Sequence, residues 1–151
     1  MTALVTNLYL VISKLVQNIE ELTLPSRIES VEEAATKAEE FARKCGCGDE
    51  HVSAIDLAIR ESVANAIKHG NQFDEEKSVD IRFVSSDDRV EILVSDHGTG
   101  FDPDEIPDPT DPANLLSASG RGILFIRTFM DTVEWSNASG GGTTVKMVKK
   151  M

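Results

Sequence analysis

Residues 61–71, with the sequence Glu-Ser-Val-Ala-Asn-Ala-Ile-Lys-His-Gly-Asn, end a helix that the apolar pattern predicts to start at its cap, Asp49, and to stop at Gly70. Glu61, Asn65 and His69 are four residues apart, so they lie along one side of this helix, away from its apolar stripe. A carboxylate one turn from an amide suits Mg²⁺, which prefers oxygen ligands, and Glu61 could take a proton from a hydroxyl or water. The same row is also typical of a solvated helix face. The apolar stripe consists of Val52, Ile55, Ile59, Val63, Ala66 and Ile67.

A second polar motif follows a predicted strand. Beyond the helix the apolar period changes to two, which predicts strands over 79–84 and 90–94, joined by a turn at Asp87-Asp88. The second strand runs into Asp96-His97-Gly98-Thr99-Gly100-Phe101, where glycines permit unusual φ angles or the close approach of a ligand. Asp96 could accept a hydrogen bond from an exocyclic amine such as that of adenine. A glycine-rich turn capped by the same Asp is the simpler alternative.

A third motif follows a long segment without apolar period. Residues 101–119 contain four prolines among acidic and small polar residues, and loops of this length are usually functional or disordered. Ser119-Gly120-Arg121-Gly122 then opens a helix predicted to run from Gly122 to Met130. Free N–H groups at a helix start can bind phosphate, and Arg121 could add a charge-assisted contact. The glycines could equally be incidental.

The remaining elements complete an α+β pattern. Residues 1–18 predict an amphipathic helix, Ile19–Leu24 a short strand that stops at Pro25, and Val31–Lys44 a helix capped by Ser30. Two further strands are predicted over 132–136 and 143–148. Strands joined by hairpins, with the helices in blocks, favour an antiparallel-rich sheet covered by helices on one face.

Composition limits the functions that this chain can have. Its 151 residues predict one domain, and a net charge of −11 argues against a general binder of nucleic acid or anionic membrane. The pattern predicts neither a secretory signal nor a membrane-spanning run, and the sequence contains no P-loop and no Rossmann glycine pattern. Cys45 and Cys47, with His51 nearby, leave a metal site conceivable, but small reduced thiols at a helix end are the simpler reading.

The three motifs, in this order, resemble those of the Bergerat-fold or GHKL ATPases, and most of all the small anti-sigma-factor serine/threonine kinases of bacterial stress-response and sporulation switches. The resemblance covers Leu22 to Lys150 and includes Gly142-Thr143-Thr144-Val145 near the end. It implies a two-layer sandwich: a mixed, mostly antiparallel sheet with helices on one face and a mobile ATP lid at 102–119. It also implies an extension at residues 1–18 and a single ATP-binding kinase domain at 19–151.

The resemblance assigns roles by position. Asn65 would coordinate Mg²⁺ between the phosphates, and Glu61 would be the catalytic base. Asp96 would read the adenine amine, and Thr143 or Thr144 would lie beside the base. The other residues expected to contact ATP are His69, Gly98, Gly100, Gly120, Arg121 and Gly122.

Family members of this kind sequester a sigma factor and phosphorylate its anti-anti-sigma antagonist on Ser or Thr. The resemblance therefore implies ATP and Mg²⁺ as cofactors, a cytoplasmic homodimer, and no direct contact with nucleic acid or membrane. Two alternatives stay open. One is a histidine-kinase catalytic module, although the helix Val31–Lys44 has no acceptor His. The other is an ATP-binding, non-catalytic partner-switch regulator.

Overall fold

The structure is a computed structural model that describes residues 16–99, 118–138 and 140–151. Most of the predicted N-terminal helix and of the predicted lid therefore lies outside the described residues. At its described end the predicted helix is wrong, because Val16 and Gln17 are not helical and Asn18 already belongs to the first strand. The elements are, in chain order, β1 (Asn18–Pro25), α2 (Glu29–Lys44), α3 (Asp49–Asn65), the short π-helix η1 (Ala66–Gly70), β2 (Ser78–Ser86), β3 (Arg89–Ser95), α4 (Ala118–Phe129), β4 (Thr132–Asn137) and β5 (Thr143–Lys150).

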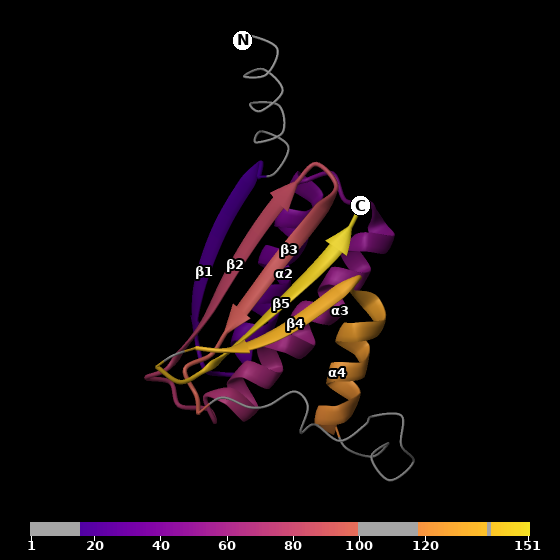
Figure 1. Ribbon diagram of the computed structural model, residues 1–151. Coiled ribbons are helices and arrows are strands. Elements are labelled where there is room, and N and C mark those ends of the chain that lie inside the picture. Colours follow the sequence, from indigo (N-terminus) through magenta and orange to yellow (C-terminus); the bar gives the residue numbers. More distant parts are fainter. Residues whose placement is uncertain (1–15, 100–117, 139) are drawn as a thin grey trace, which may run out of the picture.

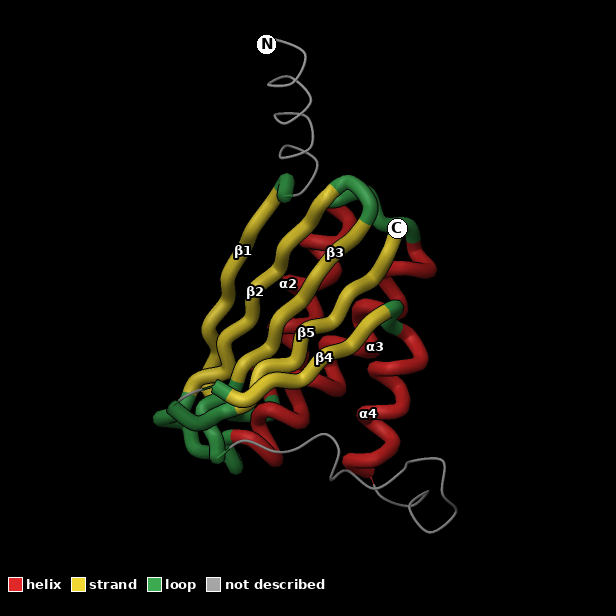
Figure 2. Tube along the Cα trace, in the orientation of Figure 1, coloured by secondary structure: helices red, strands yellow, loops and turns green. Residues whose placement is uncertain are grey.

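The strands form one five-stranded sheet in the order β1-β2-β3-β5-β4, and the helices cover one of its faces (Figures 1 and 2). This confirms the predicted two-layer α+β fold. The prediction of a mixed sheet is wrong for the described residues, because all four strand pairings there are antiparallel. The register places Ile81 opposite Val94, and Val94 opposite Val145, in a row that faces the helices.

The core lies between the sheet and α2 and α3. Alanines on the inner side of α2 let this helix approach the sheet closely, and Phe41 of α2 packs on Phe83 of β2 with ring centroids 5.4 Å apart. Aromatic pairs at this distance add attraction beyond the area that they bury. On α3, Ala58, Ile59 and Val63 are fully buried, and Ile55 is 1% exposed.

Two predicted helix caps are wrong. Ser30 lies inside α2, where its hydroxyl donates to the carbonyl oxygen of Pro25 at 2.7 Å instead of capping the helix. The N-cap of α3 is Gly48, and Asp49 is the first helical residue, where it forms an ion pair with Arg43 at 2.9 Å. In both cases the side chain bonds to another partner instead of capping the helix.

The long helix ends in a π-turn. After Asn65 the chain continues as η1, and the N–H of Asn71 donates to the carbonyl oxygen of Ala66 at 2.8 Å. Gln72 and Phe73 then adopt positive φ angles of 51° and 59°, a conformation that non-glycine residues rarely take. Single π-turns in helices are frequent at functional sites.

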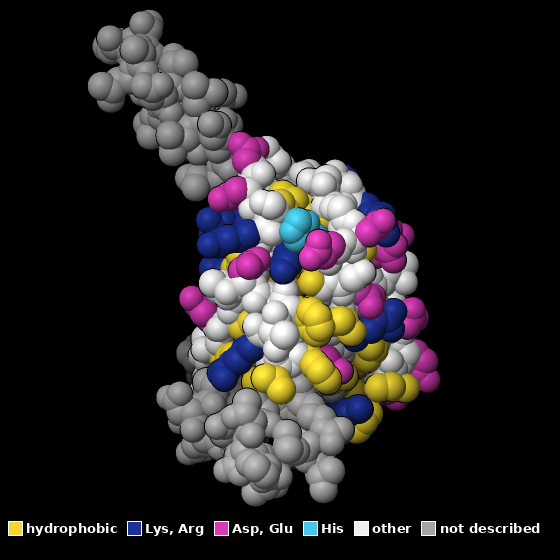
Figure 3. Space-filling model, turned by 90° about the vertical axis from the view of Figure 1, so that its right-hand side faces the viewer, with side chains coloured by type: hydrophobic (Ala, Val, Ile, Leu, Met, Phe, Trp, Pro, Cys, Tyr) yellow, Lys and Arg dark blue, Asp and Glu magenta, His cyan; other side chains and the backbone are white. Residues whose placement is uncertain are grey.

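Helix α4 begins at Ala118, four residues before its predicted start. Gly120, Arg121 and Gly122 therefore lie in its first turns rather than ahead of it. The first turn of a helix leaves its N–H groups without partners inside the helix. Figure 3 shows apolar side chains gathered on the face toward α4, and Phe125 of α4 and Leu57 of α3 are 45% and 42% exposed. No helix among the described residues is long and apolar enough to span a membrane.

Candidate functional site

Asp96 lies directly after β3 and is only 8% exposed. Its Oδ1 accepts hydrogen bonds from the N–H groups of Gly98 at 3.0 Å and Thr143 at 3.1 Å. The N–H of Asp96 donates in turn to the carbonyl oxygen of Thr143 at 2.9 Å. Within the described part of the chain, no hydrogen bond is donated to Oδ2. The carboxylate is therefore held in one orientation and keeps one oxygen available as an acceptor.

Two glycines allow other segments to approach this carboxylate. A Cβ on Gly70, at the end of η1, would lie 2.3 Å from Cγ of Asp96. A Cβ on Gly142, in the turn before β5, would lie 2.2 Å from the carbonyl oxygen of Asp96, and Gly142 also has a φ of +92°. Side chains do not tolerate such distances, so only glycine lets the helix end and the turn enclose Asp96.

Glu61 and Asn65 project from α3 toward the first turns of α4. A Cβ on Gly122 would lie 2.7 Å from Oε2 of Glu61 and 3.6 Å from Nδ2 of Asn65. Both side chains are partly buried. The structure thus brings together three residues of two separate sequence motifs, beside a helix start whose free N–H groups favour anions.

The donors on α3 fit a magnesium ion better than a softer metal. An amide and a carboxylate one turn apart offer hard oxygens, and Mg²⁺ completes its shell with water and phosphate oxygens. No group of three or more His, Cys, Asp or Glu side chains gathers anywhere in the described residues, so the conceivable site at Cys45, Cys47 and His51 has no such support. Burial raises the pKa of the Cys47 thiol, and its Sγ donates to Sδ of Met151 at 3.3 Å.

Consecutive positions near the start of β5 differ in their surroundings. Thr143 is 5% exposed and bonds to Asp96 through its backbone. Thr144 points to the other face of the sheet, where its hydroxyl is 2.7 Å from that of Ser95. Of the two threonines that the sequence left open, only Thr143 lies beside the carboxylate.

The other predicted residues are not all part of this cluster. His69 is exposed in the last turn of η1. Gly98 belongs to the cluster through its bond to Asp96. Gly100 lies outside the described residues, and the structure does not describe the side chain of Arg121. The ring Nε2 of His97 lies 2.7 Å from Oδ2 of Asp80, whose strand position alternates away from the helices.

Asn71 is a residue for which the sequence patterns predicted no role, because it lies beyond the glycine that ends the helical row. It is 1% exposed, and its Oδ1 accepts from the N–H of His97 at 2.7 Å. Its Nδ2 donates to Oγ of Ser26 at 2.8 Å and to the carbonyl oxygen of Ser78 at 2.9 Å. A polar residue directly after a helix-ending glycine was the one signal for it.

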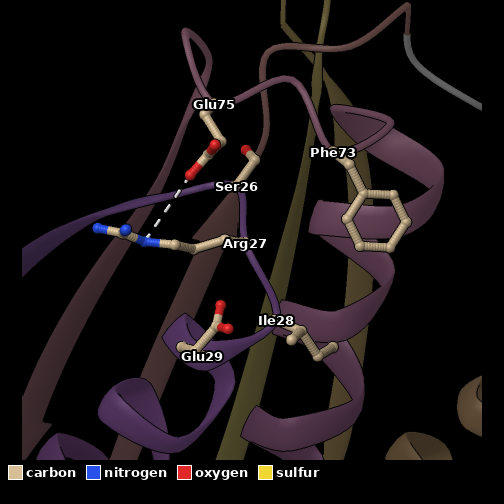
Figure 4. A pocket seen from close by; sticks show the side chains of 6 residues that line it. All are labelled: Ser26, Arg27, Ile28, Glu29, Phe73 and Glu75. Atoms are coloured by element: carbon tan, nitrogen blue, oxygen red, sulfur yellow. Dashed lines mark ion pairs between the residues drawn. The ribbon is translucent and has the colours of Figure 1, made fainter.

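A shallow hollow of about 400 Å³ opens where the β1–α2 turn meets the segment after η1 (Figure 4). Arg27 points toward Glu75 across it, with the two side chains 3.9 Å apart, while Phe73 and Ile28 are 53% and 50% exposed. None of these residues belongs to the three sequence motifs, so the hollow and the Asp96 cluster are formed by different residues.

Known proteins resemble the chain along most of its length. A family model described as "Histidine kinase-like ATPase domain" matches residues 24–149. The serine-protein kinase RsbW of Bacillus subtilis is 30% identical over 135 residues, which cover 85% of this chain and 83% of that protein. The anti-sigma F factor of Clostridium perfringens is 36% identical over 104 residues, covering 68% and 74% respectively.

A solved structure shares the fold. It contains the RsbU and RsbW domains of a Mycobacterium tuberculosis protein and matches with a TM-score of 0.65 at 18% identity. The match covers 88% of this chain and 32% of that longer chain.

Proposed function

We propose a function that starts from the family of this chain, which belongs to the histidine kinase-like ATPase domain family. The chain is an ATP-dependent anti-sigma factor and serine/threonine protein kinase. It binds a sigma factor and phosphorylates the anti-anti-sigma antagonist that would otherwise release that factor. Relatives matching over two thirds or more of the chain carry the names serine-protein kinase and anti-sigma F factor, which supports this reading. The observation that carries it is the meeting of Glu61 and Asn65 with Gly122 of α4.

Asp96 would recognise the adenine end of ATP. Its Oδ1 is occupied by two backbone N–H groups, so the exocyclic amine of adenine would donate to Oδ2. Thr143, rather than Thr144, would lie beside the base, and Gly98 would let the backbone pass close to it. A carboxylate at this point rejects guanine, which presents a carbonyl oxygen where adenine has its amine.

Glu61 and Asn65 would act at the phosphate end. The amide oxygen of Asn65 would hold Mg²⁺, which supplies neutralisation of charge on the phosphates when bound. The start of α4, with Gly120, Arg121 and Gly122, would approach the same phosphates, to which the free N–H groups of its first turn and the Arg121 charge would be offered.

The transfer step then needs only one proton acceptor from the protein. A Ser or Thr hydroxyl of the antagonist attacks the γ-phosphorus while its proton passes to the carboxylate of Glu61. The bond from the γ-phosphorus to the β–γ bridging oxygen breaks, and ADP leaves with that electron pair. Catalysis here consists of positioning and charge stabilisation, which is most of what phosphoryl transfer requires.

The family resemblance also leads us to include three finer points in the proposal. The kinase works as a homodimer, uses Mg²⁺ with its ATP, and acts in the cytoplasm. The acidic balance of −11 fits a protein whose partners are other proteins rather than nucleic acid.

The Glu61→Gln variant tests the catalytic assignment. With Mg-ATP and the antagonist protein from the same cell, the unaltered chain should produce phosphoserine or phosphothreonine, read by mass spectrometry. Glu61→Gln should bind ATP with affinity unchanged within about twofold and transfer at least about a hundredfold more slowly, because it has lost the base. Glu50→Gln, exposed in the first turn of the same helix, is the control and should transfer normally.

Other outcomes exclude parts of the proposal. Equal transfer by Glu61→Gln removes its role as base. Phosphohistidine on the chain itself would favour a histidine-kinase module. ATP binding without any transfer, together with capture of the sigma factor, would favour a non-catalytic regulator.

A further inference from the structure

The segment that carries Asp96 is fixed through three consecutive backbone N–H groups. That of Asp96 donates to the carbonyl oxygen of Thr143, and that of Gly98 returns to Oδ1 of Asp96. The one between them, on His97, donates to the side chain of Asn71 at 2.7 Å. This middle bond ties the segment to the residue that follows the end of the long helix.

Asn71 is itself held on every side. Its backbone N–H donates to Ala66, and its carbonyl oxygen accepts from the N–H of Asp74 at 3.0 Å. Its Nδ2 faces Ser26 and the carbonyl oxygen of Ser78 at 2.9 Å. A carbonyl can only accept, so the amide nitrogen must point there and Oδ1 must face His97. The residue is only 1% exposed, so these bonds are shielded from solvent.

The helix end and the segment after β3 are also in direct contact. A Cβ on Gly98 would lie 2.1 Å from the carbonyl oxygen of Gly70, the residue before Asn71. The hydrogen bond of Asn71 to His97 therefore spans an interface in which the backbones of Gly70 and Gly98 are already in contact. Glu61 and Asn65 precede Asn71 by ten and six residues on the same continuous helix, so this contact sets both ends of the site relative to each other.

We propose that Asn71 is a positioning residue for nucleotide: through the N–H of His97 it fixes the adenine-reading Asp96 relative to Glu61 and Asn65. The proposal rests on the nucleotide site proposed above. Asn71 does not contact ATP; losing its amide leaves the N–H of His97 without its acceptor and lets the segment drift. A drift of this kind weakens the adenine contact and leaves the phosphate contacts in place.

The test compares Asn71→Ala with Ser26→Ala in the full chain. Ser26 is also 1% exposed and bonds the same amide, but on the side away from His97. Dissociation constants for Mg-ATP and Mg-GTP are measured by calorimetry, and Tm without nucleotide reports stability. Asn71→Ala should weaken ATP binding about tenfold and reduce the preference for ATP over GTP by the same factor, with GTP binding nearly unchanged. Ser26→Ala should lower Tm yet keep the preference within about twofold.

The outcomes separate this inference from the function on which it rests. If the unaltered chain does not bind ATP, the proposed function fails. If it binds ATP selectively and folded Asn71→Ala keeps the full preference, the positioning role of Asn71 is wrong. Should Asn71→Ala not fold, hydrogen exchange in the unaltered chain decides: the amide of His97 must be protected, and exchange at the rate of an unprotected amide would overturn the inference.

Discussion

Gly122 illustrates how one absent side chain shapes the proposed active site. Its Cα lies so close to α3 that a Cβ would be 2.7 Å from Oε2 of Glu61. In a helix, alanine is favoured over glycine by up to about 1 kcal/mol, so helix stability alone would select against glycine here. The geometry makes room for the Glu61 carboxylate at the expense of that stability.

The Gly122→Ala variant should separate stability from activity. We expect Tm to stay level or rise, because Ala stabilises α4, while kcat for phosphoryl transfer falls about tenfold or more as Glu61 is displaced. Gly140→Ala is the control, since a Cβ there meets nothing within 4 Å. An unchanged kcat in Gly122→Ala would mean that the position of Glu61 does not limit transfer.

Individual site residues could be predicted from the sequence only where their spacing was local. Glu61 and Asn65 share one helix, so the residue count alone put them on one side of it. The choice between Thr143 and Thr144 depended on which face of β5 meets the helices, and strand register is a tertiary property. Asn71 was missed because its partners Ser26 and Ser78 belong to other elements.

At the scale of elements, β1 and α2 are joined by a charged clamp on the helix side of the sheet. Glu20 of β1 lies 3.0 Å from Nζ of Lys44 and 3.2 Å from Nζ of Lys37. The hydrogen bond from Lys44, followed by that from Lys37, lowers the pKa of Glu20 below its ordinary 4.5. A carboxylate with a lowered pKa stabilises the fold above its unfolded pKa, and this contribution is lost as the pH falls through the folded value.

The Glu20→Gln variant should therefore show a pH-dependent loss of stability. At neutral pH we expect the free energy of unfolding, measured with urea, to fall by no more than about 1 kcal/mol, because the pairs are near the surface. The difference should shrink as the pH drops from 4.5 through the lowered pKa. Glu21→Gln, which loses only a pair with Arg82 on the open face, should have less effect. A gap that persists in strong acid would point to packing instead of charge.

Helix boundaries were the least predictable feature of the elements. Strand positions followed directly from the apolar alternation, and the turn at residues 87 and 88 was correct. The starts of α2 and α3 differ from the prediction because capping is a weak local preference that nearby partners override, and α4 begins four residues before its predicted start. The predicted caps Ser30 and Asp49 both found such partners, in Pro25 and Arg43.

At the scale of the whole molecule, the sequence predicted the layers and left the assembly of the site open. Alternating strands and amphipathic helices have to bury their apolar sides, so a sheet covered on one face follows from the pattern. The strand order β1-β2-β3-β5-β4 does not, because it depends on pairings between segments far apart in the chain. That order places β5 beside β3, which is what brings Thr143 to Asp96.

The most direct test of ATP recognition at this site is calorimetric titration of Mg-ATP and Mg-GTP into the full chain and into Asp96→Asn. Asparagine keeps Oδ1 for the N–H groups of Gly98 and Thr143, but replaces Oδ2 with a donor that repels the adenine amine. We expect the unaltered chain to bind ATP in preference to GTP. The variant should stay folded and bind ATP more weakly by about tenfold to a hundredfold. Equal ATP affinity in the two proteins, or no binding by the unaltered chain, would contradict the proposed site.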